Sequence, residues 1–258
     1  KIPRKIENTM SETIVQKFGG TSLGSVERID AVAEIIKKAS KKNKIAVVVS
    51  AMSGETNRLI DLASSFGNNP DKREFDALVS TGETISSALL SMALHSKGIK
   101  ARSFSASQIA IRTTSSYSKA KILDVDAKKI LDVLENDTIP IITGFQGITE
   151  GGDITTLGRG GSDTTAVAIA AQINANRCDI YTDVDGIFTT DPDIVSNAKK
   201  LDSITMEEML ELAGQGAKVV QTRAVEFANK YHVPVRVLSS FNDGSGTLIS
   251  FCLLYTSD

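Results

Sequence analysis

Histidine and cysteine are scarce in this chain, whose 258 residues include two of each: His95, His232, Cys178 and Cys252. Two cysteines form neither a disulfide framework nor a metal-ligand cluster, and they are typical of a protein kept in a reducing cytosol. Two histidines leave little material for a zinc site or a Ser-His-Asp triad. Both histidines are most simply surface or packing residues, and Cys178 a small core residue.

Neither sign of charge dominates, because 29 Lys and Arg oppose 31 Asp and Glu for a net charge of −2. This balance gives no electrostatic reason to expect a nucleic acid or an anionic membrane as partner. The uncharged run Ile85 to Ser96 is too short to span a bilayer, and no apolar segment follows the basic residues at the N-terminus. We therefore expect a cytoplasmic globular protein.

Two familiar nucleotide-binding motifs are also missing. The sequence contains no Gly-x-x-x-x-Gly-Lys-Ser/Thr loop and no Gly-x-Gly-x-x-Gly fingerprint. A phosphate site in this chain therefore needs another architecture.

The length corresponds to one large domain or two small ones. The residues before Met10 carry no periodic pattern, and those from Phe251 to Asp258 follow a terminal strand without turn or helix signals. We therefore expect one domain over 10–250, with 1–9 and 251–258 as atypical ends outside the fold.

Short apolar strands alternate with longer amphipathic segments. Strands are predicted at 13–18, 45–49, 99–104, 139–143, 179–182, 235–238 and 247–249. Helices are predicted at 26–36, 57–66, 83–97, 126–135, 162–173, 207–213 and 217–231, with a loop or loose hairpin at 146–159. Strands separated by helices imply right-handed crossovers, so we predict an α/β fold: a three-layer α/β/α sandwich with a mainly parallel central sheet.

Ligands of an open α/β sheet bind beyond the carboxyl ends of its strands, so glycine-marked polar strand ends are the candidate sites. Lys17-Phe18-Gly19-Gly20 ends the first predicted strand. Paired glycines let the backbone approach a phosphate, and a lysine supplies positive charge for a migrating phosphoryl group. The alternative is a tight turn beside an exposed lysine.

Gly158-Arg159-Gly160-Gly161-Ser162-Asp163 is the second candidate, directly before a predicted helix. An arginine between glycines can clamp a carboxylate while backbone amides complete the site. Asp163 could instead serve only to complement the helix dipole. Arginine and aspartate together suit a zwitterionic ligand.

Three further strand ends could hold ligands or serve local structure. The hydroxyls of Ser50–Thr56 could bind a small polar ligand or cap the next helix. Glu83 could bind an ammonium group or sit in the first turn of a helix. The acidic stretch Tyr181–Pro192 could seat a nucleotide or form a solvated loop.

Taken together, these stretches resemble the aspartate kinases, which have the amino acid kinase fold. Three motifs carry the resemblance in order: Val15–Leu23 (VQKFGGTSL), Thr155–Thr165 (TTLGRGGSDTT) and Tyr181–Gly186 (YTDVDG). The likeness extends from about Thr13 to Ser250.

The resemblance implies transfer of the γ-phosphoryl group of Mg-ATP to the β-carboxylate of L-aspartate, giving 4-phospho-L-aspartate for lysine, threonine and methionine synthesis. It implies that Lys17 stabilises the transferring group and that Asp163 orients Lys17 or the substrate amine. The aspartate-binding positions it implies are Ser50, Thr56, Glu83, Arg159, Gly160, Gly161 and Ser162. The ATP-binding positions it implies are Lys17, Phe18, Gly19, Gly20, Thr182, Asp183, Phe188, Asp191 and Lys218.

The residue chemistry agrees with this assignment. A carboxylate is already a nucleophile at neutral pH, so alignment and charge neutralisation suffice without a general base. No side chain is assigned as a direct Mg²⁺ ligand, since the phosphates supply most of its ligands.

The sequence departs from the family pattern in three places. Asp193 stands where relatives often have arginine, so an arginine contact to ATP is missing, and Val220–Arg223 replaces a segment that often contains His-Pro beside Lys218. Relatives usually continue into two regulatory ACT domains, which do not follow Ser250 here. We therefore expect no feedback inhibition by lysine or threonine through the usual site, and a homodimer formed by the kinase domains themselves.

Two other functions stay open. One is another amino acid kinase, acting on glutamate, N-acetylglutamate or UMP. The other is a truncated, non-catalytic domain that binds ATP and aspartate without turnover. Retention of Lys17, Glu83, Arg159 and Asp163 argues against the second.

Overall fold

A computed structural model describes residues 11–67, 69–192, 194–214 and 219–251 of the chain. The strands of its main sheet are β1 (Thr13–Phe18), β2 (Lys44–Val49), β3 (Ala101–Phe104), β6 (Ile139–Thr143), β9 (Arg177–Thr182), β10 (Ser203–Thr205), β11 (Val235–Ser239) and β12 (Thr247–Ser250). Within the described ranges these eight strands lie in the order β10-β12-β11-β9-β1-β2-β6-β3. Only the β11–β12 pair of this sheet is antiparallel, so the predicted mainly parallel sheet is confirmed.

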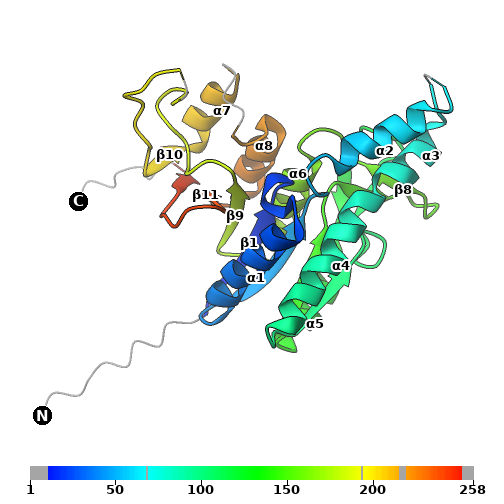
Figure 1. Cartoon of the computed structure of the whole chain (residues 1–258), viewed down its shortest axis with the longest axis horizontal. Coiled ribbons are helices and arrows are strands. Elements are labelled where there is room, and N and C mark those ends of the chain that lie inside the picture. The colour runs from blue at the N-terminus through cyan, green and yellow to red at the C-terminus, as the bar shows by residue number, and fades with distance from the viewer. Residues whose placement is uncertain (1–10, 68, 193, 215–218, 252–258) are drawn as a thin grey trace, which may run out of the picture.

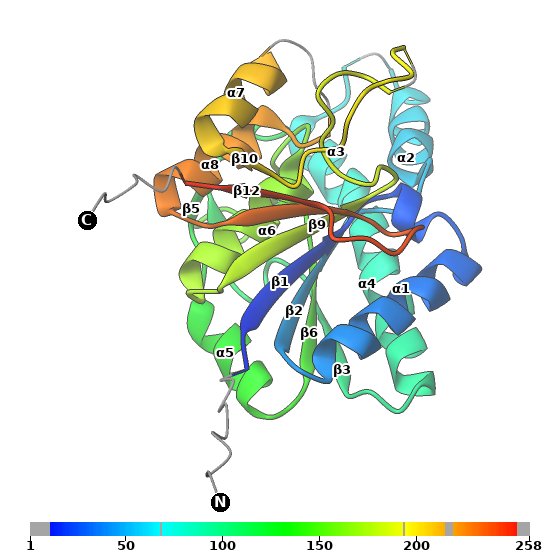
Figure 2. The ribbon, with the colours of Figure 1, turned by 90° about the vertical axis from the view of Figure 1, so that its left-hand side faces the viewer.

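Helices cover both faces of this sheet (Figure 2). They are α1 (Val26–Ser40), α2 (Glu55–Ser64), α3 (Lys72–Val79), α4 (Thr81–Ser96), α5 (Ala127–Glu135), α6 (Gly161–Gln172), α7 (Met206–Gly214) and α8 (Thr222–Tyr231), with a 3₁₀ turn η1 (Thr21–Leu23) after β1. α1 and α4 pack on one face and α5, α6 and α8 on the other, which makes the predicted three-layer sandwich.

Alternation along the central strand explains the two cores. Ile14 and Phe18 of β1 pack with α1 and α4, whereas Val15 packs in the cluster with α5, α6 and α8. α6 is buried from Gly161 to Ala170, and its small side chains let a helix lie close against the sheet. The carboxyl end of β1 is thereby placed next to the start of α6.

A second, smaller sheet completes the fold, and it was not predicted. Its strands are β4 (Arg112–Thr113), β5 (Ile122–Asp124), β7 (Gln146–Ile148) and β8 (Ile154–Thr156), in the order β5-β4-β7-β8. The predicted loop or loose hairpin at 146–159 contains the antiparallel β7–β8 hairpin of this sheet. Strands of two or three residues are too short to show alternation in the sequence.

The predicted elements differ from the structure at several points. α3 and β10 were missed, since both are short. The helix predicted at 217–231 starts only at Thr222, because Gln221 has an extended backbone and Val220 is buried outside the helix. Phe251, placed outside the fold, packs against the core and against the ring of His232 at a centroid distance of 5.0 Å.

α3 and α4 form an almost continuous helical run, because Ser80 between them keeps a right-handed helical backbone. Together with α2 and β8 they build one end of the molecule, while α7, α8, β10 and β11 build the other (Figure 1). By length and composition alone the run Lys72–Ser96 could cross a membrane, but half of its most apolar window is buried inside this fold. Burial of this kind is expected of a core helix.

Candidate active site

A cavity of about 380 Å³ lies at the carboxyl ends of the central strands. Both predicted catalytic residues and every predicted aspartate-binding residue line it, namely Lys17, Ser50, Thr56, Glu83, Arg159, Gly160, Gly161, Ser162 and Asp163. They come from the ends of β1 and β2, the starts of α2, α4 and α6, and the loop after β8. The cavity therefore brings together residues that lie up to 146 positions apart in the sequence (Lys17 to Asp163).

Lys17 and Asp163, which both line this cavity, form an ion pair. Lys17 Nζ lies 2.7 Å from Asp163 Oδ1, and the two side chains are only 12% and 9% exposed. An ion pair with little solvent around it is screened less than one on the surface. The pair therefore holds the lysine ammonium at a defined point beside Gly19, where a Cβ would lie 3.4 Å from Lys17 Nζ.

The N-terminus of α6 faces the same cavity. Gly160 precedes the helix with φ +70°, and a Cβ there would lie 2.3 Å from Gln221 Cγ. A Cβ on Gly161 would lie 2.8 Å from Phe145 Cδ2. Glycine is thus required at both positions, and the positive end of the helix dipole borders the cavity. Asp163 lies in the first turn of α6, where a carboxylate complements the helix dipole. It also forms the ion pair with Lys17, so complementing the dipole is not its only contact.

Glu83 is a second carboxylate in the cavity, and its surroundings differ from those of Asp163. It is 3% exposed, and its Oε1 accepts a hydrogen bond from the Ala51 N–H at 3.2 Å. Within the described ranges its Oε2 has no hydrogen-bond partner. Burial raises the pKa of Glu83 to about 8. A bound ammonium group would satisfy Oε2 and favour the ionised carboxylate.

Arg159 is the exposed cation of the cavity rim. In the part of the chain that the structure describes, its guanidinium makes neither an ion pair nor a hydrogen bond. A planar guanidinium without an internal partner is suited to bidentate binding of a carboxylate or phosphate.

The predicted nucleotide-binding residues do not all lie in one cavity, unlike the predicted aspartate-binding residues. Gly19 N–H donates to the Tyr181 carbonyl at 3.3 Å, so the glycine pair of β1 lies beside the end of β9. Thr182 and Asp183 follow at this end, where Thr182 Oγ1 donates to Asp183 Oδ1 at 3.0 Å. Neither they nor Phe188 and Asp191 line the cavity, and Lys218 lies outside the described residues.

Phe18 can meet a nucleotide only through its backbone. Its side chain is fully buried and stacks on Tyr181 with ring centroids 4.6 Å apart. Strand alternation accounts for this, because Phe18 faces the α1–α4 core while Lys17 faces the opposite side of the sheet.

Two cavity residues were missed. Phe145 follows β6 with φ +67°, and its N–H donates to Thr165 Oγ1 at 3.2 Å. The sequence Gly144-Phe145-Gln146-Gly147 at a predicted strand end was a usable signal for it. Gln221 reaches the cavity from the segment before α8. The sequence marked Val220–Arg223 only as a departure from the family pattern beside Lys218, not as part of this cavity.

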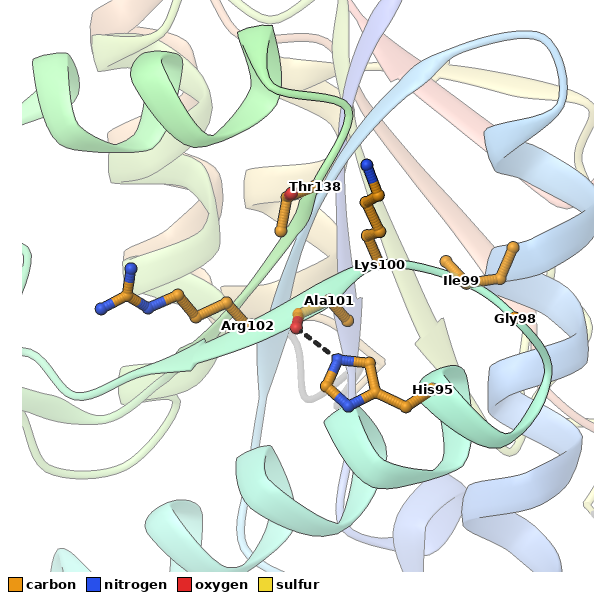
Figure 3. Close-up of a pocket in the computed structure, with 7 residues that line it drawn as sticks. All are labelled: His95, Gly98, Ile99, Lys100, Ala101, Arg102 and Thr138. Carbon is orange, nitrogen blue, oxygen red and sulfur yellow. Dashed lines mark hydrogen bonds between the residues drawn. The ribbon is translucent and has the colours of Figure 1, made fainter.

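A larger cavity of about 470 Å³ lies at the opposite edge of the sheet, around the start of β3 (Figure 3). His95 bonds the Ala101 carbonyl there through Nε2 at 2.7 Å, while Lys100 and Arg102 point away from each other. Its polar side chains do not converge, and it lies at the amino ends of β3 and β6, so we do not assign it as the active site.

The profile of the amino acid kinase family matches residues 12–239. The chain belongs to this family. It is 58% identical over 238 residues to an aspartate kinase of Stutzerimonas stutzeri, a match that covers 92% of this chain and 58% of that protein. This chain therefore spans less than two thirds of the length of that curated relative.

Solved structures agree with the family assignment. Aspartate kinase from Synechocystis superposes with a TM-score of 0.85 at 45% identity, over 95% of this chain and 41% of that one. Escherichia coli aspartokinase III in complex with aspartate and ADP superposes with a TM-score of 0.86 at 30% identity, over 94% of this chain and 66% of that one. The amino acid kinase fold inferred from the motifs is confirmed.

Proposed function

We propose that this chain is the catalytic domain of an aspartate kinase, which transfers the γ-phosphoryl group of ATP to the β-carboxylate of L-aspartate. The observation that carries the proposal is the meeting of Lys17, Glu83 and Arg159 in one cavity. Aspartate kinases among its relatives, one of them solved with aspartate and ADP, support the same substrates. The product, 4-phospho-L-aspartate, would enter lysine, threonine and methionine synthesis in the cytoplasm.

The cavity has complementary charges for an amino acid with two carboxylates. Glu83 Oε2, buried and unpartnered within the described ranges, would accept a hydrogen bond from the substrate ammonium. Arg159 would bind one carboxylate from the rim. The other carboxylate would then point towards Lys17 and the start of α6.

Phosphoryl transfer forms a bond between a β-carboxylate oxygen and the γ-phosphorus and breaks the bond from that phosphorus to the β,γ-bridging oxygen, releasing ADP. Lys17, held by Asp163 at 2.7 Å, would neutralise charge on the transferring group. Gly20 and the start of α6 would leave room and supply a positive dipole end for the phosphates. No side chain has to remove a proton, because the acceptor is already ionised.

The residues present fit a Mg²⁺ ion that arrives bound to ATP. In the described parts of the chain, no group of three or more His, Cys, Asp or Glu could hold a metal. Phosphate oxygens and water would therefore provide most ligands, and the ion would supply Lewis-acid neutralisation of the phosphates.

Incubation of the purified chain with Mg-ATP, L-aspartate and hydroxylamine tests the proposal. An acyl phosphate is trapped as aspartyl hydroxamate, so product that depends on both ATP and aspartate is expected. Parallel reactions with glutamate, N-acetylglutamate or UMP separate the other amino acid kinases. Folded protein that binds ATP and aspartate by calorimetry without forming hydroxamate would instead indicate the non-catalytic domain.

A further inference from the structure

Asp76 of α3 is fully buried but does not line the active-site cavity. It forms no ion pair with any described residue, and burying a carboxylate without a cation is costly unless hydrogen bonds replace its hydration. Both of its oxygens are fully used by two residues from distant segments, Ser118 and Thr156.

The two carboxylate oxygens of Asp76 accept hydrogen bonds from different kinds of donor. Oδ2 accepts from the backbone N–H of Ser118 at 2.8 Å and of Thr156 at 2.7 Å. Oδ1 accepts from the hydroxyls of the same residues, at 3.0 Å for Ser118 and 2.9 Å for Thr156. One side chain thus clamps both segments to α3.

The clamped strand leads directly to Arg159, three residues after Thr156. Arg223 holds the same region from α8, donating to the carbonyls of Leu157 at 2.9 Å and Ala120 at 3.2 Å. The Ser118 carbonyl lies 3.1 Å from where a Cβ on Gly158 would be. The chain before Arg159 is therefore fixed from two sides.

The helical run that carries Asp76 also carries Glu83, seven residues later. Seven residues are about two helical turns, so the two carboxylates lie on one face about 10 Å apart along the axis. We propose that Asp76 is a positioning residue that sets the spacing between Glu83 and the Arg159 loop, and thereby the length of amino acid that both can bind. This inference rests on the proposed function, since that function supplies the ligand.

Two substitutions distinguish the hydrogen bonds of Asp76 from its negative charge. Asp76→Ala removes all four bonds. Asp76→Asn can keep both backbone bonds through its carbonyl oxygen, and its amide can donate to the two hydroxyls, which rotate to accept. The matched control is Asp153→Ala, because the partly exposed Asp153 accepts hydrogen bonds in the same region from Arg73 Nε at 2.8 Å and from the Tyr117 hydroxyl at 3.1 Å.

Steady-state kinetics then give the first readout. Asp76→Ala should raise KM for aspartate at least about 10-fold and leave KM for ATP within about 2-fold, because only the acceptor loop is released. Asp76→Asn and Asp153→Ala should stay within about 3-fold of the parent chain. Unchanged KM for aspartate in Asp76→Ala, or an equal rise in KM for ATP, would overturn the inference.

Hydrogen exchange of the segment 154–161 gives a second readout that needs no activity. Asp76→Ala should accelerate exchange there by about 10-fold or more, and Asp76→Asn should not. If the parent chain neither binds nor phosphorylates aspartate, the proposed function fails, while exchange still decides the clamp. If Asp76→Ala does not fold, Thr156→Val removes one bond only. It should still raise KM for aspartate about 3-fold, and parent-like kinetics would contradict the inference.

Discussion

The two halves of the proposed site are built differently. The proposed acceptor half is a cavity whose groups come from the sheet, α4 and α6, and its key side chains Lys17, Glu83 and Asp163 are largely buried. The proposed nucleotide half follows β9, where Asp183 and Asp191 are exposed and Thr182 and Phe188 only partly buried. Groups fixed in a dry cavity act more strongly than the same groups in water. Substitutions should therefore have graded effects, largest in the acceptor half.

Lys17→Ala should have the largest effect and lower kcat by about 10²–10³-fold, because the lost charge acts mainly in the transition state. Hydroxamate formation at saturating substrates measures it. Lys41→Ala, which removes an exposed lysine after α1, is the matched control. A near-normal kcat for Lys17→Ala would remove this residue from the mechanism.

Glu83→Gln should raise KM for aspartate by roughly 10–100-fold, since the ammonium loses its ionised partner. Burial raises the pKa of Glu83 to about 8, so the free protein holds this carboxyl mostly protonated at pH 7. Aspartate must displace that proton to gain the ion pair. KM for aspartate should therefore fall as pH rises from about 7 to 9, and binding at pH 7 should release close to one proton.

Calorimetry in buffers of different ionisation enthalpy measures this proton release. Glu83→Gln should abolish it and flatten the pH dependence of KM, whereas the exposed Glu135→Gln should do neither. Binding by the parent chain without proton release would show that Glu83 does not meet the ammonium.

Arg159→Ala should weaken aspartate binding by about 10-fold and change kcat little, because an exposed guanidinium binds ground state and transition state alike. Arg102→Ala, from the cavity near β3, serves as control. An Arg159→Ala protein with parent-like affinity for aspartate would exclude this residue from the acceptor site.

Asp183→Ala should have the smallest effect, raising KM for ATP by less than about 5-fold, because exposed charges contribute little. KM for aspartate should not move. The neighbouring Asp185→Ala controls for loop charge. If Asp183→Ala lowered kcat/KM by a larger factor than Lys17→Ala, the comparison between the two halves would be reversed.

Much of this arrangement could be predicted from local sequence. The strands at 13–18 and 139–143 have the predicted bounds, and Ser25 caps α1 through its side chain, which accepts a hydrogen bond from the Arg28 N–H. The polar strand ends at Lys17 and Ser50 were found because parallel strands bring their carboxyl ends to one edge. Arg159, which follows β8 of the smaller sheet, was found because glycines flank it before a predicted helix. Local sequence did not show that the Phe18 side chain turns into the core, which leaves only its backbone for a nucleotide contact.

By itself, the sequence determined the order of strands and helices, the glycine turns and the chemical groups available for phosphoryl transfer, because periodicity and turn chemistry act over a few residues. Only the tertiary structure decided which carboxylate is paired and which is not. Asp163 meets Lys17, Glu83 is left buried with a raised pKa, and Asp76 joins Thr156 across 80 positions. Burial and long-range hydrogen bonds arise from packing, and packing has no local signature.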